Sequence, residues 1–327
     1  MNALLSELRG LEAAVLADWL HLRCPVCTQT MPAPGSHSAT CGHCGYELAC
    51  KDGIWNALPP AREQYYARFI REYEHIRSRE GRGSLAAAYY LALPFRDLTG
   101  CNSQQWRIRA RTFNYVQRRI LPGLRAQLKR PLDVLDLGAG NGWLSYRLSL
   151  LGDRAVAVDL MVNQEDGLGA ARHYIAQLRP PFSRFRAELD RLPFADEQFD
   201  CAIFNASFHY SEDYERTLRE AFRCVRPGGA VVIADTAWYS RAESGEQMVA
   251  ERRAAFLRRY GFASDALNSQ EFLTDQRLHR LEVSLGIRWE VYQPCYGLGW
   301  AMRPWVARFK RRREPSRFRI YVARERA

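Results

Sequence analysis

The chain has 327 residues, of which 47% are hydrophobic, so it can hold one large domain with a sizeable core and a smaller domain beside it. No run of about 18 apolar residues occurs, which excludes a transmembrane helix. The net charge of +11 is uneven, because residues 60–130 carry +10 and residues 303–327 carry +8. The remaining residues are therefore acidic overall, and the basic surface belongs to a middle segment and the tail.

Residues 1–21 predict a short amphipathic helix. This segment carries acidic side chains and lacks the basic start and small-residue cleavage site of a signal peptide. The chain has nine cysteines, and four of them have the spacing of metal ligands, which fits a reducing compartment better than a disulfide framework. We therefore expect a cytoplasmic protein.

Residues 22–59 form a short segment rich in cysteine and interrupted by glycine and proline. It contains two Cys-x-x-Cys pairs, whose members are Cys24, Cys27, Cys41 and Cys44. The spacing is typical of a zinc ribbon, and four thiolates would close a tetrahedral Zn²⁺ site with no open position for water. The pattern thus predicts a structural zinc rather than a catalytic one. His37 or His43 could replace one cysteine.

Residues 60–130 are expected to be mostly helical. Apolar side chains recur three and four residues apart at Tyr66, Phe69, Tyr73 and Ile76, which places them on one face of a helix. The segment Leu93–Ser103 interrupts the helical pattern before it resumes. We interpret this region as a helical lid or linker.

Residues 131–327 change to an alternation of strands and helices. Four short runs rich in Val, Ile, Ala and Leu are separated by helical stretches, and they are "LDVLDLG", "RAVAVDL", "FDCAIFNAS" and "GAVVIADT". This order predicts an α/β fold with a parallel sheet.

A glycine-rich turn follows the earliest of these strands. Gly138, Gly140 and Gly142 alternate with other residues between the strand and the next helix, where glycine lets the backbone approach a ligand. Asp159 ends the next strand, where a carboxylate can accept two hydrogen bonds from a ribose diol. The third glycine of the dinucleotide fingerprint would fall at Trp143, which argues against a nicotinamide-dependent dehydrogenase.

The turn after "VLDLG" resembles the first motif of class I S-adenosylmethionine (SAM)-dependent methyltransferases of the type 11-like group. "RAELDRLPFADEQFD", "NASFHYSEDYERTLREAFRCVRPGG" and "AVVIADT" are similar to later segments of that family. The resemblance covers Leu132–Thr236 well and implies a Rossmann-like seven-stranded sheet, with "RWEVYQP" and "RFRIYVARE" as its last two strands. With its zinc ribbon, the chain is also partly similar to zinc-ribbon 23S rRNA guanine-N1 methyltransferases.

The resemblance implies a SAM site. The glycines would flank the methionine part, Asp136 would reach its amino group and Asp159 the ribose. Glu188 would face the adenine amine, with Asp190 as the alternative. The expected cofactor residues are Asp136, Gly138, Gly140, Asn141, Gly142, Asp159, Glu188, Leu189 and Asn205.

Methyl transfer from a sulfonium is an in-line displacement that requires a positioned acceptor and the exclusion of water. His209 follows the fourth strand of the family pattern and could act as a base, or could simply pack against the cofactor. Tyr210 would line the same pocket. These two residues are our catalytic candidates.

Two hypotheses for the acceptor remain open. In one, the methyl group goes to a small or lipid-linked organic molecule, the helical segment covers the pocket, and residues 296–313 make peripheral contact with a membrane through Trp300, Trp305 and the adjacent arginines. In the other, the protein is an rRNA or tRNA base methyltransferase whose ribbon and basic segments bind RNA.

Overall fold

The computed structural model describes residues 19–35 and 37–325. Most of the helix expected over residues 1–21 lies outside these residues. The strands are β1 (Ser38–Thr40), β2 (Glu47–Lys51), β3 (Ile54–Asn56), β4 (Asp133–Leu137), β5 (Arg154–Asp159), β6 (Ser183–Arg186), β7 (Phe199–Asn205), β8 (Val225–Ala234), β9 (Glu290–Tyr292) and β10 (Ile320–Arg324). The helices are α2 (Pro60–Arg79), α3 (Ala87–Ala92), α4 (Ser103–Tyr115), α5 (Leu121–Leu128), α6 (Trp143–Leu150), α7 (Arg172–Ile175), α8 (Tyr214–Cys224), α9 (Ala242–Tyr260), α10 (Asp275–Leu285), α11 (Leu298–Ala301) and α12 (Arg303–Phe309).

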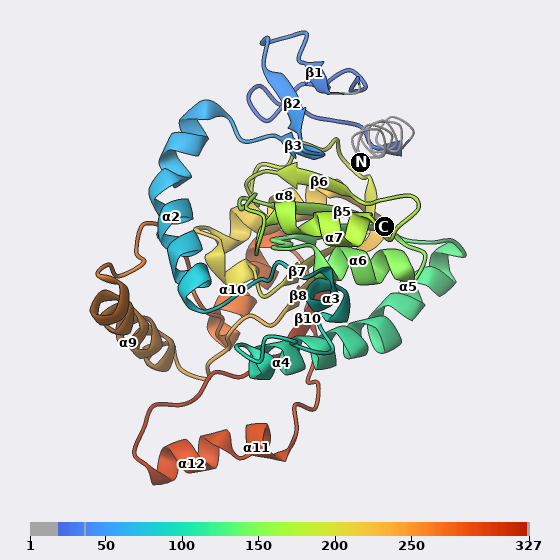
Figure 1. Ribbon diagram of the computed structural model, residues 1–327. Helices are drawn as coiled ribbons and strands as arrows, with labels where there is room; N and C mark the ends of the chain where they lie inside the picture. Colours follow the sequence, from blue (N-terminus) through green and yellow to red (C-terminus); the bar gives the residue numbers. More distant parts are fainter. Residues whose placement is uncertain (1–18, 36, 326–327) are drawn as a thin grey trace.

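One sheet organises the described part of the chain (Figure 1). Its strand order is β1-β2-β3-β6-β5-β4-β7-β8-β10-β9. The strands β6, β5, β4, β7 and β8 run parallel, and β10 lies antiparallel between β8 and β9. If the seven strands from β4 to β10 are numbered 1 to 7 in chain order, their order in the sheet is 3-2-1-4-5-7-6. This order confirms the expected seven-stranded Rossmann-like sheet. The order reverses between β4 and β7, where doubly wound sheets bind their ligands.

The cysteine-rich segment extends this sheet rather than standing apart from it. Strand β3 pairs in parallel with β6, and Trp55 lies opposite Phe185 in the register. Their rings stack with centroids 6.4 Å apart, and both side chains are buried. The sequence did not indicate this pairing, because it joins segments about 130 residues apart. The ribbon therefore protects an edge of the sheet that would otherwise be open.

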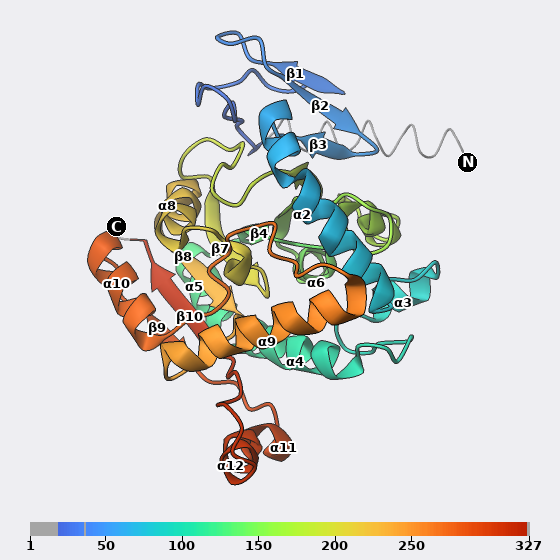
Figure 2. The same cartoon turned by 90° about the vertical axis from the view of Figure 1, so that its left-hand side faces the viewer.

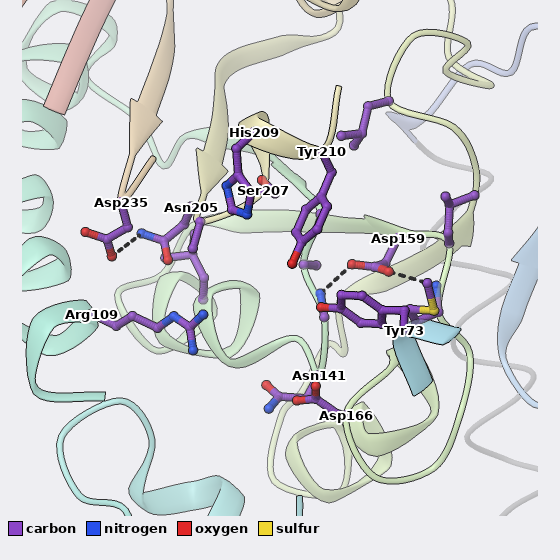
Figure 3. A pocket seen from close by; sticks show the side chains of 18 of the residues that line it. Tyr73, Arg109, Asn141, Asp159, Asp166, Asn205, Ser207, His209, Tyr210 and Asp235 are labelled. Carbon is purple, nitrogen blue, oxygen red and sulfur yellow. Dashed lines mark hydrogen bonds between the residues drawn. The ribbon is translucent and has the colours of Figure 1, made fainter. Parts of the chain in front are cut away.

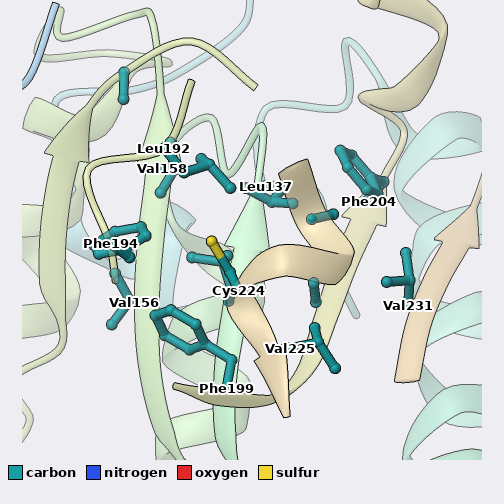
Figure 4. Packing of buried hydrophobic residues seen from close by; sticks show 14 of the residues in the cluster. Leu137, Val156, Val158, Leu192, Phe194, Phe199, Phe204, Cys224, Val225 and Val231 are labelled. Carbon is teal, nitrogen blue, oxygen red and sulfur yellow. The ribbon is translucent and has the colours of Figure 1, made fainter. Parts of the chain in front are cut away.

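The sheet is covered on both faces because successive side chains of its central strands point to opposite sides. In β4, Val134 packs into the cluster that contains residues of α4, α5 and α6. Leu135 and Leu137 pack into the other cluster, with residues of α8 and α10. Figure 4 shows this second cluster, in which Phe204 and Cys224 lie near Leu137. These buried faces fix the sheet and hence the positions of its strand ends.

The region 60–130 forms α2, α3, α4, a π-helical turn and α5. The interruption at Leu93–Ser103 falls between α3 and α4, as the sequence indicates. Helices α11 and α12 project away from the rest of the protein in both views (Figures 1 and 2). In the part of the chain that the structure describes, no helix is long and apolar enough to span a bilayer.

Candidate functional site

The carboxyl ends of β4, β5, β7 and β8 meet at a cavity of about 570 Å³ (Figure 3). Side chains from α2 and α4 close the cavity from the other side. The cavity brings together most of the residues expected to bind the cofactor or to act in catalysis, which are Asp136, Gly138, Gly140, Asn141, Asp159, Leu189, Asn205, His209 and Tyr210. Two expected residues, Gly142 and Glu188, are not among those that line it.

The glycine turn closes tightly over the end of β4. Gly138 and Gly140 have φ values of +74° and +56°, which favour glycine. A Cβ atom on Gly138 would lie 2.2 Å from the Cβ of Ser207, so no larger residue fits there. Gly142 has a structural role instead, because it precedes α6 with φ +83° and packs against the ring of Phe182. Gly142 thus does not line the cavity.

Two carboxylates lie beside this turn. Asp159 accepts hydrogen bonds from the backbone nitrogens of Gly140 and Met161, each at 2.7 Å. Asp136 accepts from the backbone nitrogen of Ser145 at 3.1 Å and from its hydroxyl at 2.8 Å. Burial raises the pKa of both aspartates, and it brings the pKa of Asp136 to about 7. The cavity thus holds a carboxyl group that a cationic ligand group would ionise.

The acid expected to face adenine is placed differently from the prediction. Glu188 is buried, and its carboxylate binds Arg62 of α2 and lies 3.5 Å from Arg191. Arg62 therefore holds this side chain outside the cavity. Leu189 and Asp190 do line the cavity, and Asp190 is also ion-paired with Arg216 at 3.0 Å.

A third carboxylate follows β8 and was missed from the sequence. Asp235 accepts a hydrogen bond of 2.6 Å from the hydroxyl of Thr112 and one of 3.5 Å from the side-chain amide of Asn205. The Tyr296 hydroxyl lies 2.8 Å from that of Thr112. Burial raises the pKa of Asp235. One signal could have found it, because Asp235 follows a buried strand just as Asp159 ends one.

His209 and Tyr210 lie on a short 3₁₀ turn after β7. Burial lowers the pKa of His209 to about 4, so its imidazole is neutral at physiological pH. Its Nδ1 atom is buried and has no hydrogen-bond partner in the described part of the chain. The ring of Tyr210 packs against Phe69 and Tyr73, with centroids 6.1 and 5.7 Å away. Helix α2 thereby places the apolar stripe of the sequence analysis over the site.

Helices α2 and α4 also bring charged and aromatic groups that the sequence did not identify. Arg77 forms an ion pair with Asp166 inside the cavity. The ring of Trp106 meets that of Trp143 edge-on at 6.1 Å. Arg109 also lines the cavity, from α4. No local motif marks these residues, since their positions depend on how the helices pack on the sheet.

The second candidate site is the cysteine cluster near the sheet edge. It consists of Cys24, Cys27, Cys41 and Cys44, which could together hold a metal ion. The four sulfur atoms lie within 4.8 Å of one another, and no histidine belongs to the group. Tetrahedral zinc with Zn–S bonds of about 2.3 Å needs sulfurs roughly 3.8 Å apart. The pairs Cys24–Cys44 and Cys27–Cys41 lie 3.6 and 3.5 Å apart, so the donor set fits zinc.

Comparison with known proteins gives matches to the part of the chain that forms the central strands of the sheet. Residues 135–233 match the family model described as "Methyltransferase domain". The malonyl-[acyl-carrier protein] O-methyltransferase of Pseudescherichia vulneris is 35% identical over 127 residues, which cover 37% of this chain and 47% of the relative. The demethylmenaquinone methyltransferase of Mycobacterium marinum is 33% identical over 102 residues, or 31% of this chain and 40% of the relative. The chain thus spans less than half the length of these curated relatives.

Among solved structures, the chain is similar to a Burkholderia thailandensis 1,6-didemethyltoxoflavin-N1-methyltransferase with bound 1,6-didemethyltoxoflavin and S-adenosylhomocysteine. That likeness has a TM-score of 0.47 and 17% identity, and it covers 88% of this chain and 98% of the other.

Proposed function

We propose that this chain, whose residues 135–233 form a methyltransferase domain, transfers a methyl group from SAM to a small or lipid-linked organic acceptor. One observation carries the proposal. The glycine turn, Asp136 and Asp159 open onto one cavity at the point where the strand order reverses. The matched relatives named above transfer methyl groups, by their names, to an acyl-carrier protein conjugate and to a quinone precursor.

The residues of the cavity fit a SAM molecule part by part. Asp159 keeps lone pairs on both carboxylate oxygens for the ribose hydroxyls. Asp136 would bind the cationic amino group, and the open backbone of Gly138 and Gly140 would flank the methionine. We assign to Asp190 the contact with the adenine amine that the family pattern suggested for Glu188. SAM supplies the activated methyl group, and the protein has to hold and align the acceptor.

For the transfer itself, α2 and α4 would exclude water with their aromatic side chains, and the acceptor would approach from the ends of β7 and β8. The pKa of His209 is about 4, so its imidazole is neutral but only a weak base. It would therefore contribute little to the reaction rate by removing a proton from the acceptor. We propose that its unpartnered Nδ1 instead makes a hydrogen bond that positions the acceptor. Tyr210 would form the wall between acceptor and cofactor.

The two acids next to Leu189 provide a test of the cofactor site. Asp190→Asn should weaken binding of S-adenosylhomocysteine about tenfold, because it removes the charged acceptor of the adenine hydrogen bond. Glu188→Gln should leave this affinity nearly unchanged and lower the stability, since it removes the charge that pairs with Arg62. Isothermal titration calorimetry and denaturant unfolding would measure both. The reverse pattern of affinities would contradict the assignment to Asp190.

We also propose that the cysteine cluster binds one structural Zn²⁺. All four thiolates would be ligands, so none is free for catalysis. Cys24 and Cys41 belong to the same hydrophobic cluster as the central strands of the sheet. Loss of the metal would therefore loosen the edge of the sheet as well as the ribbon.

Metal analysis of the purified chain should give one zinc per molecule, and Cys24→Ser should lose it and unfold at a lower temperature. Cys50→Ser is the matched control, because Cys50 lies nearby on β2 but outside the cluster. The zinc proposal fails if the Cys24 variant keeps a full equivalent of tightly bound zinc.

RNA methylation, the alternative function, gains no support from the basic middle segment. Six of its fifteen basic residues are held in ion pairs with the protein's own acids, among them Arg62 with Glu188, Arg125 with Asp153 and Arg130 with Asp200. Those charges are not free to contact phosphates. The ribbon is likewise engaged, through its pairing with β6.

Peripheral membrane contact through α11 and α12 is the part of the proposal that concerns delivery of the acceptor. The apolar side chains of α12 are exposed, with 74% for Trp305 and 89% for Phe309, and basic residues follow directly at 310–313. Trp300 and Arg303 of the same helices line the cavity. We propose that α11 and α12 insert into an anionic bilayer surface, so that a lipid-linked acceptor enters the cavity beside them.

Sedimentation with vesicles tests this contact. The protein should bind vesicles that contain phosphatidylglycerol, and should bind phosphatidylcholine vesicles about tenfold less, because each basic residue near an anionic surface contributes about 1 kcal/mol. Trp305→Glu with Phe309→Glu should abolish binding. Leu85→Glu, at an exposed leucine before α3, is the control and should bind normally. If the double variant binds the vesicles as tightly as the wild type, α11 and α12 do not make the membrane contact.

A further inference from the structure

Arg109 is half-buried and lines the cavity, yet it forms no ion pair with an acid of the described residues. The other arginines that α2 and the loop after it bring to the cavity are paired, Arg77 with Asp166 and Arg82 with Glu80. Among the described residues, none forms a hydrogen bond or an ion pair with Arg109, and its guanidinium lies 4.8 Å from the ring centroid of Trp106. Asp235 and Asp166 line the same cavity and interact electrostatically with Arg109, but neither forms an ion pair with it.

A poorly solvated charge without an ion-pair partner, such as that of Arg109, costs free energy. Burial lowers the pKa of Arg109 to about 10, so the guanidinium stays charged at neutral pH although the protein does not solvate it well. Buried charges are normally paired, and removing a partner leaves a large penalty. Departures from such rules concentrate at functional sites, where a ligand supplies the missing group. The ligand that suits Arg109 is an anion.

The position of Arg109 relates it to the acceptor rather than to the cofactor. Figure 3 shows Arg109 on the side of Asn205 and Asp235, and Asp159 and Tyr73 on the other side. Electrostatic interactions link Arg109 to Asp235 and to His209. This half of the cavity lies at the ends of β7 and β8, beyond the glycine turn.

Two buried polar atoms in the same half of the cavity have no hydrogen-bond partner among the described residues. They are the side-chain oxygen of Asn205 and Nδ1 of His209. Both residues line the cavity together with Arg109. A buried polar atom without a partner indicates a missing ligand or water. Arg109, Asn205 and His209 thus give this half of the cavity a polar lining.

We propose that Arg109 binds a carboxylate of the methyl acceptor, so that the enzyme selects acceptors that carry an anionic group. The planar guanidinium can make two parallel hydrogen bonds to a carboxylate, which fixes its orientation as well as its charge. Among the described residues, Arg303 of α12 also lines the cavity without an ion pair, and its guanidinium lies 3.8 Å from the ring centroid of Trp300. This inference rests on the proposed function, because it assigns the substrate class of the same site.

Calorimetric titration of the full-length protein saturated with S-adenosylhomocysteine tests the proposal. The probes are benzoate and its neutral isostere benzamide, which differ in charge but hardly in shape. The wild type should bind benzoate at least about tenfold more tightly than benzamide. Arg109→Gln should abolish this preference, and Arg109→Lys should keep part of it. Arg107→Gln, at an exposed arginine on the same helix, is the matched control and should behave like the wild type.

Two results would overturn the proposal. One is equal binding of benzoate and benzamide by the wild type. The other is an Arg109→Gln variant that binds S-adenosylhomocysteine much more weakly but 5′-methylthioadenosine normally, because Arg109 would then hold the carboxylate of the cofactor. Failure of the wild type to bind S-adenosylhomocysteine would instead refute the proposed function itself, so the two failures are distinguishable.

Discussion

The site depends on one constraint, the poor solvation of three carboxyl groups at the carboxyl ends of the strands. Asp136, Asp159 and Asp235 lie at or near the ends of β4, β5 and β8, and burial raises the pKa of each. Each needs hydrogen-bond donors to remain there. Donors come from α6 for Asp136, from the glycine turn for Asp159 and from Thr112 of α4 for Asp235. These hydrogen bonds tie α6, the glycine turn and α4 to the strand ends.

This constraint also connects the helical segment to the chemistry. Helix α4 donates to Asp235 through Thr112 and carries Arg109 into the cavity, one turn away on the same face. Helix α2 contributes the aromatic wall and, through Arg62, draws Glu188 out of the site. Residues of the region 60–130 thus line the cavity. At a lateral edge of the sheet, β3 pairs with β6 and ties the cysteine cluster to the same sheet.

The parts of the fold that local patterns encode were predictable. The strands β4, β5, β7 and β8 are rich in Val, Ile and Ala, and the glycine turn and Asp159 sit at fixed places relative to them. Strand β6 was not predicted, because its sequence Ser-Arg-Phe-Arg has no apolar run. Glu188 was assigned to the cavity from its place in the chain, but an arginine 126 residues away determines where its side chain points. Arg109 and the pairing of the ribbon depend on packing between distant segments, which a single sequence does not reveal.

The central claim is that buried acids of this cavity bind SAM, and calorimetric titration with SAM at pH 6.5 in buffers of different ionisation enthalpy tests it most directly. Free Asp136, with a pKa of about 7, is largely protonated at that pH, and contact with a cationic amino group should ionise it. The account predicts that binding releases a fraction of a proton at pH 6.5 and that Asp136→Asn removes this release. At pH 8.5 the release should give way to proton uptake, because the amino group of free SAM, with a pKa of about 8, is then mostly neutral and must be protonated to bind as a cation. His209 does not contribute, because its pKa of about 4 keeps it neutral throughout. Binding with no proton release at pH 6.5, or release that persists in Asp136→Asn, would contradict it.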